Sequence, residues 1–242
     1  MIVENAGRPG FENMGIDDAL LDLADRSGRA FLRLYRWDPP GLSFGRNEPA
    51  LTRYDRDAIE RRGLSVVRRP TGGRAVWHDH EVTYAVAAPS AAFGSLAASY
   101  RAIHERLATA LRSLGAEVRL AAPGRRPLSL HAGACFTAPV GGEVVAPAGK
   151  VVGSAQVRRG SAFLQHGSIL LDGSQEPVRA VTRGTPATGG ETGLAALLGR
   201  PVDFAEVAAA IVSAWDAGPA RSQLPVTPDG GAFADPAWTW RR

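Results

Sequence analysis

Strand-like runs separated by short polar turns constrain the fold of this 242-residue chain most strongly. Residues 151–158 and 162–171 are rich in apolar side chains, and the Arg159-Gly160 pair between them is typical of a hairpin. Residues 75–78 and 82–87 also flank a short polar turn. Antiparallel neighbours can be joined by such short turns, whereas parallel strands need crossovers of about a dozen residues. The pattern therefore favours an α+β domain over regular βαβ winding.

Apolar residues at helical spacing predict separate helices beside these strands. One helix is expected over 14–24, with Asn13 as its N-cap. The longest is expected over 96–114, where one face carries five large apolar or aromatic residues and Gly115 ends the helix. Further helices are predicted over 55–62, 192–198 and 204–215, and further strands over 31–37, 42–44, 65–69, 117–120 and 143–146.

Composition limits the compartment and the kind of partner. Hydrophobic residues make up 45% of the chain and charged residues 21%, as in an ordinary globular protein. A single cysteine cannot form an internal disulfide, no apolar run reaches the roughly 18 residues of a membrane span, and the N-terminus lacks a secretory layout. We therefore expect a cytoplasmic protein. The net charge of +4 favours acidic partners, but no nucleic-acid-binding pattern accompanies it.

Lys150 is the only lysine beside 27 arginines, and Cys135 is the only cysteine. Lysine differs from arginine because its amine can lose a proton, and its pKa shifts readily on burial. A sole lysine fifteen residues after a sole cysteine suggests a nucleophile with a cationic or basic helper. The alternative is that both counts are accidental, with the cysteine acting as a small buried apolar residue.

The segment 68–78 turns through two glycines between two expected strands. Gly72 and Gly73 allow close approach of a ligand to backbone N–H groups, and Arg69 and Arg74 bracket the turn as planar donors for a carboxylate or phosphate. The spacing does not match a Walker loop. An ordinary hairpin with surface arginines is the competing interpretation.

His78-Asp79-His80 could suggest a metal site, because residues two apart on a strand share a face. No third ligand lies at a recognisable spacing, so we predict no metal site here. A structural or substrate-gating role is the better interpretation of His78.

Small residues follow the single lysine within an expected strand. Gly153, Ser154 and Ala155 leave space where larger side chains would block a groove. Polar residues also interrupt this strand and the next, and they need partners if they are buried; outward-facing positions would explain the glutamines equally well. The polar positions are Gln156, Gln165 and His166, the last followed by Gly167.

Cys135 lies among small residues in an expected loop. A nearby ammonium would lower the pKa of its thiol and raise the thiolate fraction. Either His131 or His166 could instead act as a general base in a Cys/His hydrolase, although no sequence pattern of a cysteine-protease family surrounds the thiol.

Taken in order, these segments resemble the lipoate/biotin protein ligase and octanoyltransferase superfamily. The resemblance covers about residues 13–172 and rests on Arg-Arg-Pro-Thr-Gly-Gly-Arg-Ala-Val-Trp-His at 68–78, Glu-Val-Thr-Tyr at 81–84, Cys135-Phe136, and the segments 31–47, 150–158 and 164–170. The closest similarity is to octanoyltransferases built on the lipoate-ligase plan. It implies a mixed, largely antiparallel sheet flanked by helices.

The resemblance also implies a reaction. Octanoyl would move from acyl carrier protein to a lysine of a lipoyl-accepting protein, such as the glycine cleavage H protein, with no cofactor. Cys135 would carry the acyl group and Lys150 would lie against its carbonyl. Residues 69–74 and 154–156 would line the acyl channel. The residues expected to bind substrate are Arg69, Thr71, Gly72, Gly73, Arg74, His78, Gly153, Ser154, Ala155, Gln156, His166 and Gly167.

Three features depart from this pattern or leave it open. Gly45-Arg46-Asn47 matches lipoate ligases as well as transferases, and Val140-Gly141-Gly142 is smaller than the usual residues there. We expect one catalytic domain over 1–242, with a helical part over 173–242, Trp238 and Trp240 packing the tail onto the body, and no accessory C-terminal domain. Many lipoate ligases carry such an accessory domain, so this expectation weakens the interpretation of the chain as an ATP-dependent ligase.

Other functions remain open alongside octanoyl transfer. In an ATP- and Mg-dependent lipoate ligase, residues 69–74 would hold the phosphate, Lys150 would contact the adenylate and Cys135 would be incidental. A lipoyl or octanoyl amidotransferase would use the same thiol with another donor. A binding module for acylated carrier protein would need neither residue.

Overall fold

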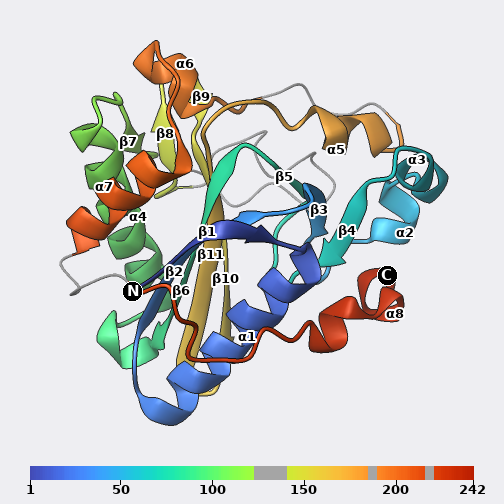
Figure 1. Ribbon diagram of the computed structural model, residues 1–242, viewed down its shortest axis with the longest axis horizontal. Helices are drawn as coiled ribbons and strands as arrows, with labels where there is room; N and C mark the ends of the chain where they lie inside the picture. The colour runs from blue at the N-terminus through green and yellow to red at the C-terminus, as the bar shows by residue number, and fades with distance from the viewer. Residues whose placement is uncertain (123–140, 185–189, 216–220) are drawn as a thin grey trace.

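A computed structural model describes residues 1–122, 141–184, 190–215 and 221–242 (Figure 1). Cys135 and His131 lie outside the described residues. Within the described ranges, every helix is too short or too polar to span a bilayer.

The central sheet has five strands in the order β1-β2-β6-β11-β10. They are β1 (Ile2–Arg8), β2 (Phe31–Trp37), β6 (Glu81–Pro89), β11 (Ala162–Leu170) and β10 (Val152–Arg159). β1 pairs with β2 in parallel, and the other neighbours are antiparallel. The predicted mixed, largely antiparallel sheet is therefore confirmed, and so is the hairpin at Gly160, whose φ is +55°.

Two three-stranded sheets lie beside the central one. The first has the order β4-β3-β5, and the second β7-β8-β9. The expected strands at 75–78 and 82–87 belong to different sheets, because β6 already has β2 and β11 on its two edges and β5 pairs with β3 instead. The bounds are β3 (Gly41–Phe44), β4 (Ser65–Arg68), β5 (Val76–His78), β7 (Arg119–Leu120), β8 (Val144–Ala146) and β9 (Gly149–Lys150).

Helix α1 (Gly10–Ser27) packs on one face of the central sheet through Met14, Leu20 and Ala24. The predicted N-cap at Asn13 is wrong, since the helix begins at Gly10 after Pro9. Asn13 is buried in the helix, and its side-chain amide donates to the carbonyls of Arg8 and Arg36 at 3.1 Å each. Its polar group ties the helix to β1 and β2 rather than capping the helix.

The opposite face of the sheet is covered by α4 (Leu96–Ser113) and α7 (Phe204–Trp215), which lie side by side (Figure 1). Ile103, Leu107 and Leu111 of α4 are fully buried in this layer, as their spacing predicted. Leu32 and Leu34 of β2 face it, whereas Phe31 and Tyr35 face α1, because successive strand residues point to opposite sides.

The remaining helices are short and lie outside the central sheet. Their bounds are α2 (Ala50–Arg53), α3 (Arg56–Arg61), α5 (Glu176–Val181), α6 (Leu194–Leu198) and α8 (Pro236–Thr239), with 3₁₀ turns at η1 (Ser90–Ala92) and η2 (Gly231–Ala234). The C-terminal segment runs past α1 to the β4-β3-β5 sheet (Figure 1).

The two late tryptophans pack the tail onto the body, as expected. Trp240 meets Phe44 edge-on with ring centroids 5.3 Å apart, and Trp238 packs against Phe233 at 5.8 Å. The tail also clasps Arg68: the Trp238 indole N–H donates to the Arg68 carbonyl at 2.8 Å, and the Arg68 guanidinium donates to the Thr239 carbonyl at 2.9 Å.

Candidate active site

A small cavity, about 30 Å³ in volume, lies between the central sheet and the β4-β3-β5 sheet. Seven of the predicted substrate-binding residues line it: Arg69, His78, Gly153, Ser154, Ala155, His166 and Gly167. The rest of the wall is formed by Met14, Tyr35, Trp37, Ser43, Val76, Thr83 and Ser168.

Small residues on β10 and β11 keep this space open. Ala155 lies opposite His166, and Ser154 lies opposite Gly167. A Cβ on Gly167 would stand 2.3 Å from the Gly153 carbonyl oxygen and 2.6 Å from Ser154 Oγ, closer than real contacts allow. The prediction of a groove along these strands is therefore consistent with the structure, and Gly167 is required by the packing.

The side chain of Arg69 holds the glycine loop, residues 69–74, through hydrogen bonds to backbone carbonyls. The Arg69 guanidinium donates to the Ser43 carbonyl at 2.9 Å, to the Gly72 carbonyl at 2.9 Å and to the Arg74 carbonyl at 2.6 Å. Arg69 is 5% exposed, so this turn is not an ordinary hairpin with surface arginines. Its donors are engaged by backbone carbonyls here, and they hold the loop rather than face an anion.

Gly73 adopts φ +88°, which favours glycine, and the loop passes close to residue 45. A Cβ on Gly45 would lie 1.9 Å from the Gly73 carbonyl oxygen, so only glycine fits there. Thr71, Gly72, Gly73 and Arg74 do not contact the cavity directly.

Thr71 anchors the loop to a buried hydrogen-bonded group. Thr71 Oγ1 lies 2.6 Å from His166 Nε2, and His166 Nδ1 lies 2.9 Å from Asp17 Oδ2. The carboxylate can only accept, so Nδ1 carries the proton and Nε2 accepts from the Thr71 hydroxyl. Burial lowers the pKa of His166 and keeps the ring neutral, although the hydrogen bond to Asp17 acts in the opposite direction.

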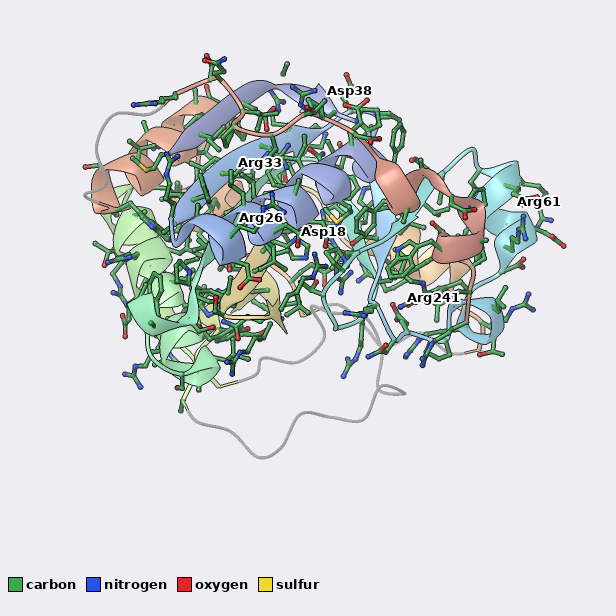
Figure 2. The ribbon with its side chains drawn as sticks, turned by 90° about the horizontal axis from the view of Figure 1, so that it is seen from below. Asp18, Arg26, Arg33, Asp38, Arg61 and Arg241 are labelled. Carbon is green, nitrogen blue, oxygen red and sulfur yellow. The ribbon has the colours of Figure 1, made fainter. Side chains whose placement is uncertain are left out.

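Asp17 is fully buried, and three side chains donate to it. Arg33 Nη1 binds Oδ1 at 2.9 Å, while the Tyr35 hydroxyl binds Oδ2 at 2.8 Å beside His166. Arg33 also pairs with Glu4 at 2.5 Å (Figure 2 labels Arg33 beside α1). This cluster was not predicted from the sequence; its local signal is Arg33, one of two arginines among the apolar and aromatic residues of the strand 31–37.

His78 occupies the cavity wall with all of its polar atoms engaged. Nε2 lies 2.7 Å from Ser43 Oγ and Nδ1 lies 2.8 Å from Glu81 Oε1, while the ring stacks on Trp37 at 3.9 Å. His80 lies in the turn after β5, and its side chain is 72% exposed, so the two histidines do not share a face. Among the described residues, no three His, Cys, Asp or Glu side chains are grouped to hold a metal.

Lys150 ends β9 and is buried, but it is not part of the cavity wall. Its Nζ donates to Glu143 Oε1 at 2.8 Å, and the Tyr100 hydroxyl donates to the same oxygen at 3.2 Å. Glu143 is itself 2% exposed. The sequence predicts no site role for Glu143 or Tyr100, because neither residue belongs to a recognisable motif.

A second polar network connects the cavity wall to the segment before Glu143. Ser154 Oγ contacts Tyr84 at 2.6 Å and His104 Nε2 at 2.8 Å, and His104 Nδ1 contacts the Gly142 carbonyl at 2.8 Å. Gln165 and Gln156 extend the network beyond Tyr84. Gln165 is fully buried, so the interpretation of outward-facing glutamines is wrong for that residue.

These features agree with the comparisons. The family model for the lipoyl protein ligase A/B catalytic domain matches residues 9–216, and the chain belongs to that family. Its curated relatives include proteins named octanoyltransferase LipM: the one from Kyrpidia tusciae is 46% identical over 71% of this chain and 65% of its own length, and the one from Symbiobacterium thermophilum is 37% identical over 85% and 81%.

A solved structure supports the fold independently. The bipartite lipoate protein ligase from Thermoplasma acidophilum, described with its E2 lipoyl domain, superposes with a TM-score of 0.76 at 19% identity, covering 99% of this chain and 95% of that one. The expected ligase-like catalytic fold is thereby confirmed. The chain spans about 65% of the length of the K. tusciae relative, so activity is argued separately below.

Proposed function

We propose that this protein is an octanoyltransferase that moves an octanoyl group from acyl carrier protein to a lysine of a lipoyl-accepting protein. The main support is a mostly apolar cavity next to the glycine loop, in a chain 46% identical to a protein named octanoyltransferase. Met14, Trp37 and Val76 supply an apolar wall for a fatty chain. The polar side chains of His166 and Ser168 contribute to the wall from β11.

In the first step, the thiolate of Cys135 attacks the octanoyl carbonyl. A sulfur–carbon bond forms, the bond to the phosphopantetheine sulfur breaks, and that sulfur leaves as a thiolate that takes up a proton. The donor is already a thioester, so the step needs no nucleotide. Cys135 lies outside the described residues, so its role stays a prediction.

Lys150 is proposed to stabilise the oxyanion as it develops. Glu143 holds its ammonium at 2.8 Å, so the positive charge is paired before substrate arrives. A positioned cation of this kind is worth about 10²–10³ in rate. The Nζ must exchange part of its contact with Glu143 for the substrate oxygen.

In the second step, the neutral amine of the acceptor lysine attacks the acyl-cysteine. An amide bond forms, the sulfur–carbon bond breaks, and the amine proton passes to the departing thiolate. The proposed acceptors are lipoyl domains or the glycine cleavage H protein, and the proposed setting is the cytoplasm. A formal charge of +4 suits acidic protein partners.

Intact-protein mass spectrometry tests this function. The purified chain is incubated with octanoyl-acyl carrier protein, with and without ATP and Mg²⁺, and then with a lipoyl domain. An octanoyl adduct without ATP, lost with hydroxylamine and absent in Cys135→Ala, is expected. Val181→Ala, at a buried position outside the cavity wall, is the matched control and should still be acylated. Transfer that requires ATP and survives Cys135→Ala would instead support the ligase.

A further inference from the structure

His104 on α4 is buried and lies between two elements of the candidate site. Its Nδ1 is 2.8 Å from the Gly142 carbonyl, which can only accept a hydrogen bond. The proton of the neutral ring is therefore on Nδ1, and Nε2 is an acceptor. Burial, together with the positive charge of Lys150, lowers the pKa of His104 to about 4, although the hydrogen bond to the Gly142 carbonyl acts in the opposite direction.

This tautomer fixes the direction of each hydrogen bond beyond it. Ser154 must donate its one hydroxyl proton to His104 Nε2, so Ser154 Oγ accepts from the Tyr84 hydroxyl at 2.6 Å. Tyr84 in turn accepts from the amide of Gln165 at 2.8 Å. The network therefore runs one way, from β11 through the cavity strand β10 to the Gly142 carbonyl.

Gly142 directly precedes the residue that holds Lys150. The oxygen of Glu143 that accepts from Lys150 also accepts from Tyr100, which lies one helical turn before His104. The rings of Tyr100 and His104 meet edge-on at 4.2 Å. Gly142 has φ +88°, so its backbone is held in a conformation that few other residues adopt. His104 thus contacts the backbone on one side of Glu143 and the ring that reaches its carboxylate.

We propose that His104 is a positioning residue. Its hydrogen bond to the Gly142 carbonyl fixes Glu143, and through Glu143 the ammonium of Lys150, relative to the cavity wall at Ser154. The consequence for catalysis rests on the octanoyltransferase function proposed above, whereas the positioning itself does not.

The same contacts could describe a serine nucleophile with a histidine base, but two features oppose that role. The partner of Nδ1 is a neutral carbonyl rather than the carboxylate that stabilises an imidazolium. The ring is buried beside Lys150, so proton uptake is unfavourable. A ring that stays neutral is suited to holding groups in place.

Three substitutions separate the two hydrogen bonds of His104. In His104→Asn the amide nitrogen takes the place of Nδ1 and can still donate to Gly142. In His104→Gln the amide reaches the place of Nε2 and can meet only Ser154. His104→Phe keeps the ring and loses both bonds. Asn and Gln each retain one bond, so similar melting temperatures are expected for this matched pair.

The readout is the side-chain NMR signal of Lys150 after lysine-selective ¹³C labelling, which is unambiguous because the chain has one lysine. His104→Asn should keep the wild-type signal and a kcat for octanoyl transfer within about threefold. His104→Gln and His104→Phe should shift and broaden the signal and lower kcat by about tenfold or more, with KM for the donor little changed.

The proposal is overturned if the Asn and Gln variants give the same Lys150 signal, or if His104→Phe leaves that signal unchanged. A stable octanoyl adduct on Ser154 in wild-type protein would favour the nucleophile role instead. If the wild-type protein transfers no octanoyl group, the function proposed above fails, while the NMR comparison still decides whether His104 positions Lys150.

Discussion

Asp17 and Asp18 are neighbours on α1, but their replacement by asparagine should have very different effects on stability. Asp17 is fully buried, and Arg33 and Tyr35 donate to its opposite oxygens. An amide has one accepting oxygen, so Asp17→Asn can serve only one of these donors. Arg33 also loses one of the two carboxylates that balance its buried charge.

The magnitude follows from these contacts. A lost charge-assisted bond costs about 1.5–3 kcal/mol, and an unsatisfied buried donor costs about 1–3 kcal/mol. Together they give a loss of about 2.5–6 kcal/mol. The usual cost of breaking a buried ion pair, about 3–5 kcal/mol, lies within this range and is the value we expect. Asp18 binds Arg159, whose side chain is 40% exposed, and Asp22 also binds Arg159. Asp18→Asn should therefore cost only about 0.2–1 kcal/mol.

Urea denaturation followed by tryptophan fluorescence measures both variants. With an m-value of about 3 kcal/mol/M, Asp17→Asn should lower the midpoint by about 1 M or more, and Asp18→Asn by less than about 0.3 M. Equal midpoints for the two variants would refute the reasoning, because they would mean that the Asp17 cluster contributes no more than a surface pair.

Three further predictions concern other parts of the molecule. The folded-state pKa of His104, about 4, lies below its ordinary value of 6.5, so the neutral ring contributes stability above pH 6.5 that is lost as the pH falls towards 4. Denaturation measured across that pH range should show the free energy of unfolding falling by about 3 kcal/mol through this group, and by less in His104→Asn. Gly45→Ala should cost about 1–3 kcal/mol in thermal unfolding through its clash with Gly73, whereas Gly72→Ala, with open space at Cβ, should stay within about 0.5 kcal/mol. Val76→Phe should fill the cavity and lower kcat/KM for an octanoyl donor more than for a butanoyl donor; an unchanged ratio would place the acyl chain elsewhere.

The elements that the sequence predicted well carry their signal locally. The strand at 31–37 and the helix at 204–215 have the predicted bounds, because apolar spacing and flanking polar or proline residues define both. β1 was missed, since its sequence IVENAGR is mostly polar or small and it becomes a strand by pairing in parallel with β2. Pairing of that kind depends on a partner elsewhere in the chain.

The candidate site divides in the same way. The small residues at 153–155 and the His-Gly pair at 166–167 marked a cavity wall in the sequence, and all five line the cavity. What holds them in place could not be predicted, because His166 and Asp17 are 149 positions apart and His104 and Gly142 are 38 apart. The predicted roles of Cys135 and His131 fall outside the described residues.

The hydrogen bonds between the C-terminal tail and Arg68 connect the tail to the candidate site. Arg68 ends β4 and immediately precedes the glycine loop. From the last helix, Trp238 donates to the backbone carbonyl of Arg68 and the Thr239 carbonyl accepts from its side chain. The carbonyl of Arg242 also accepts from the Leu51 amide. Substitutions at Trp238 or Thr239 would therefore loosen the end of β4 beside the cavity-wall residue Arg69, and kinetic constants of such variants would depend on the tail as well as on the site.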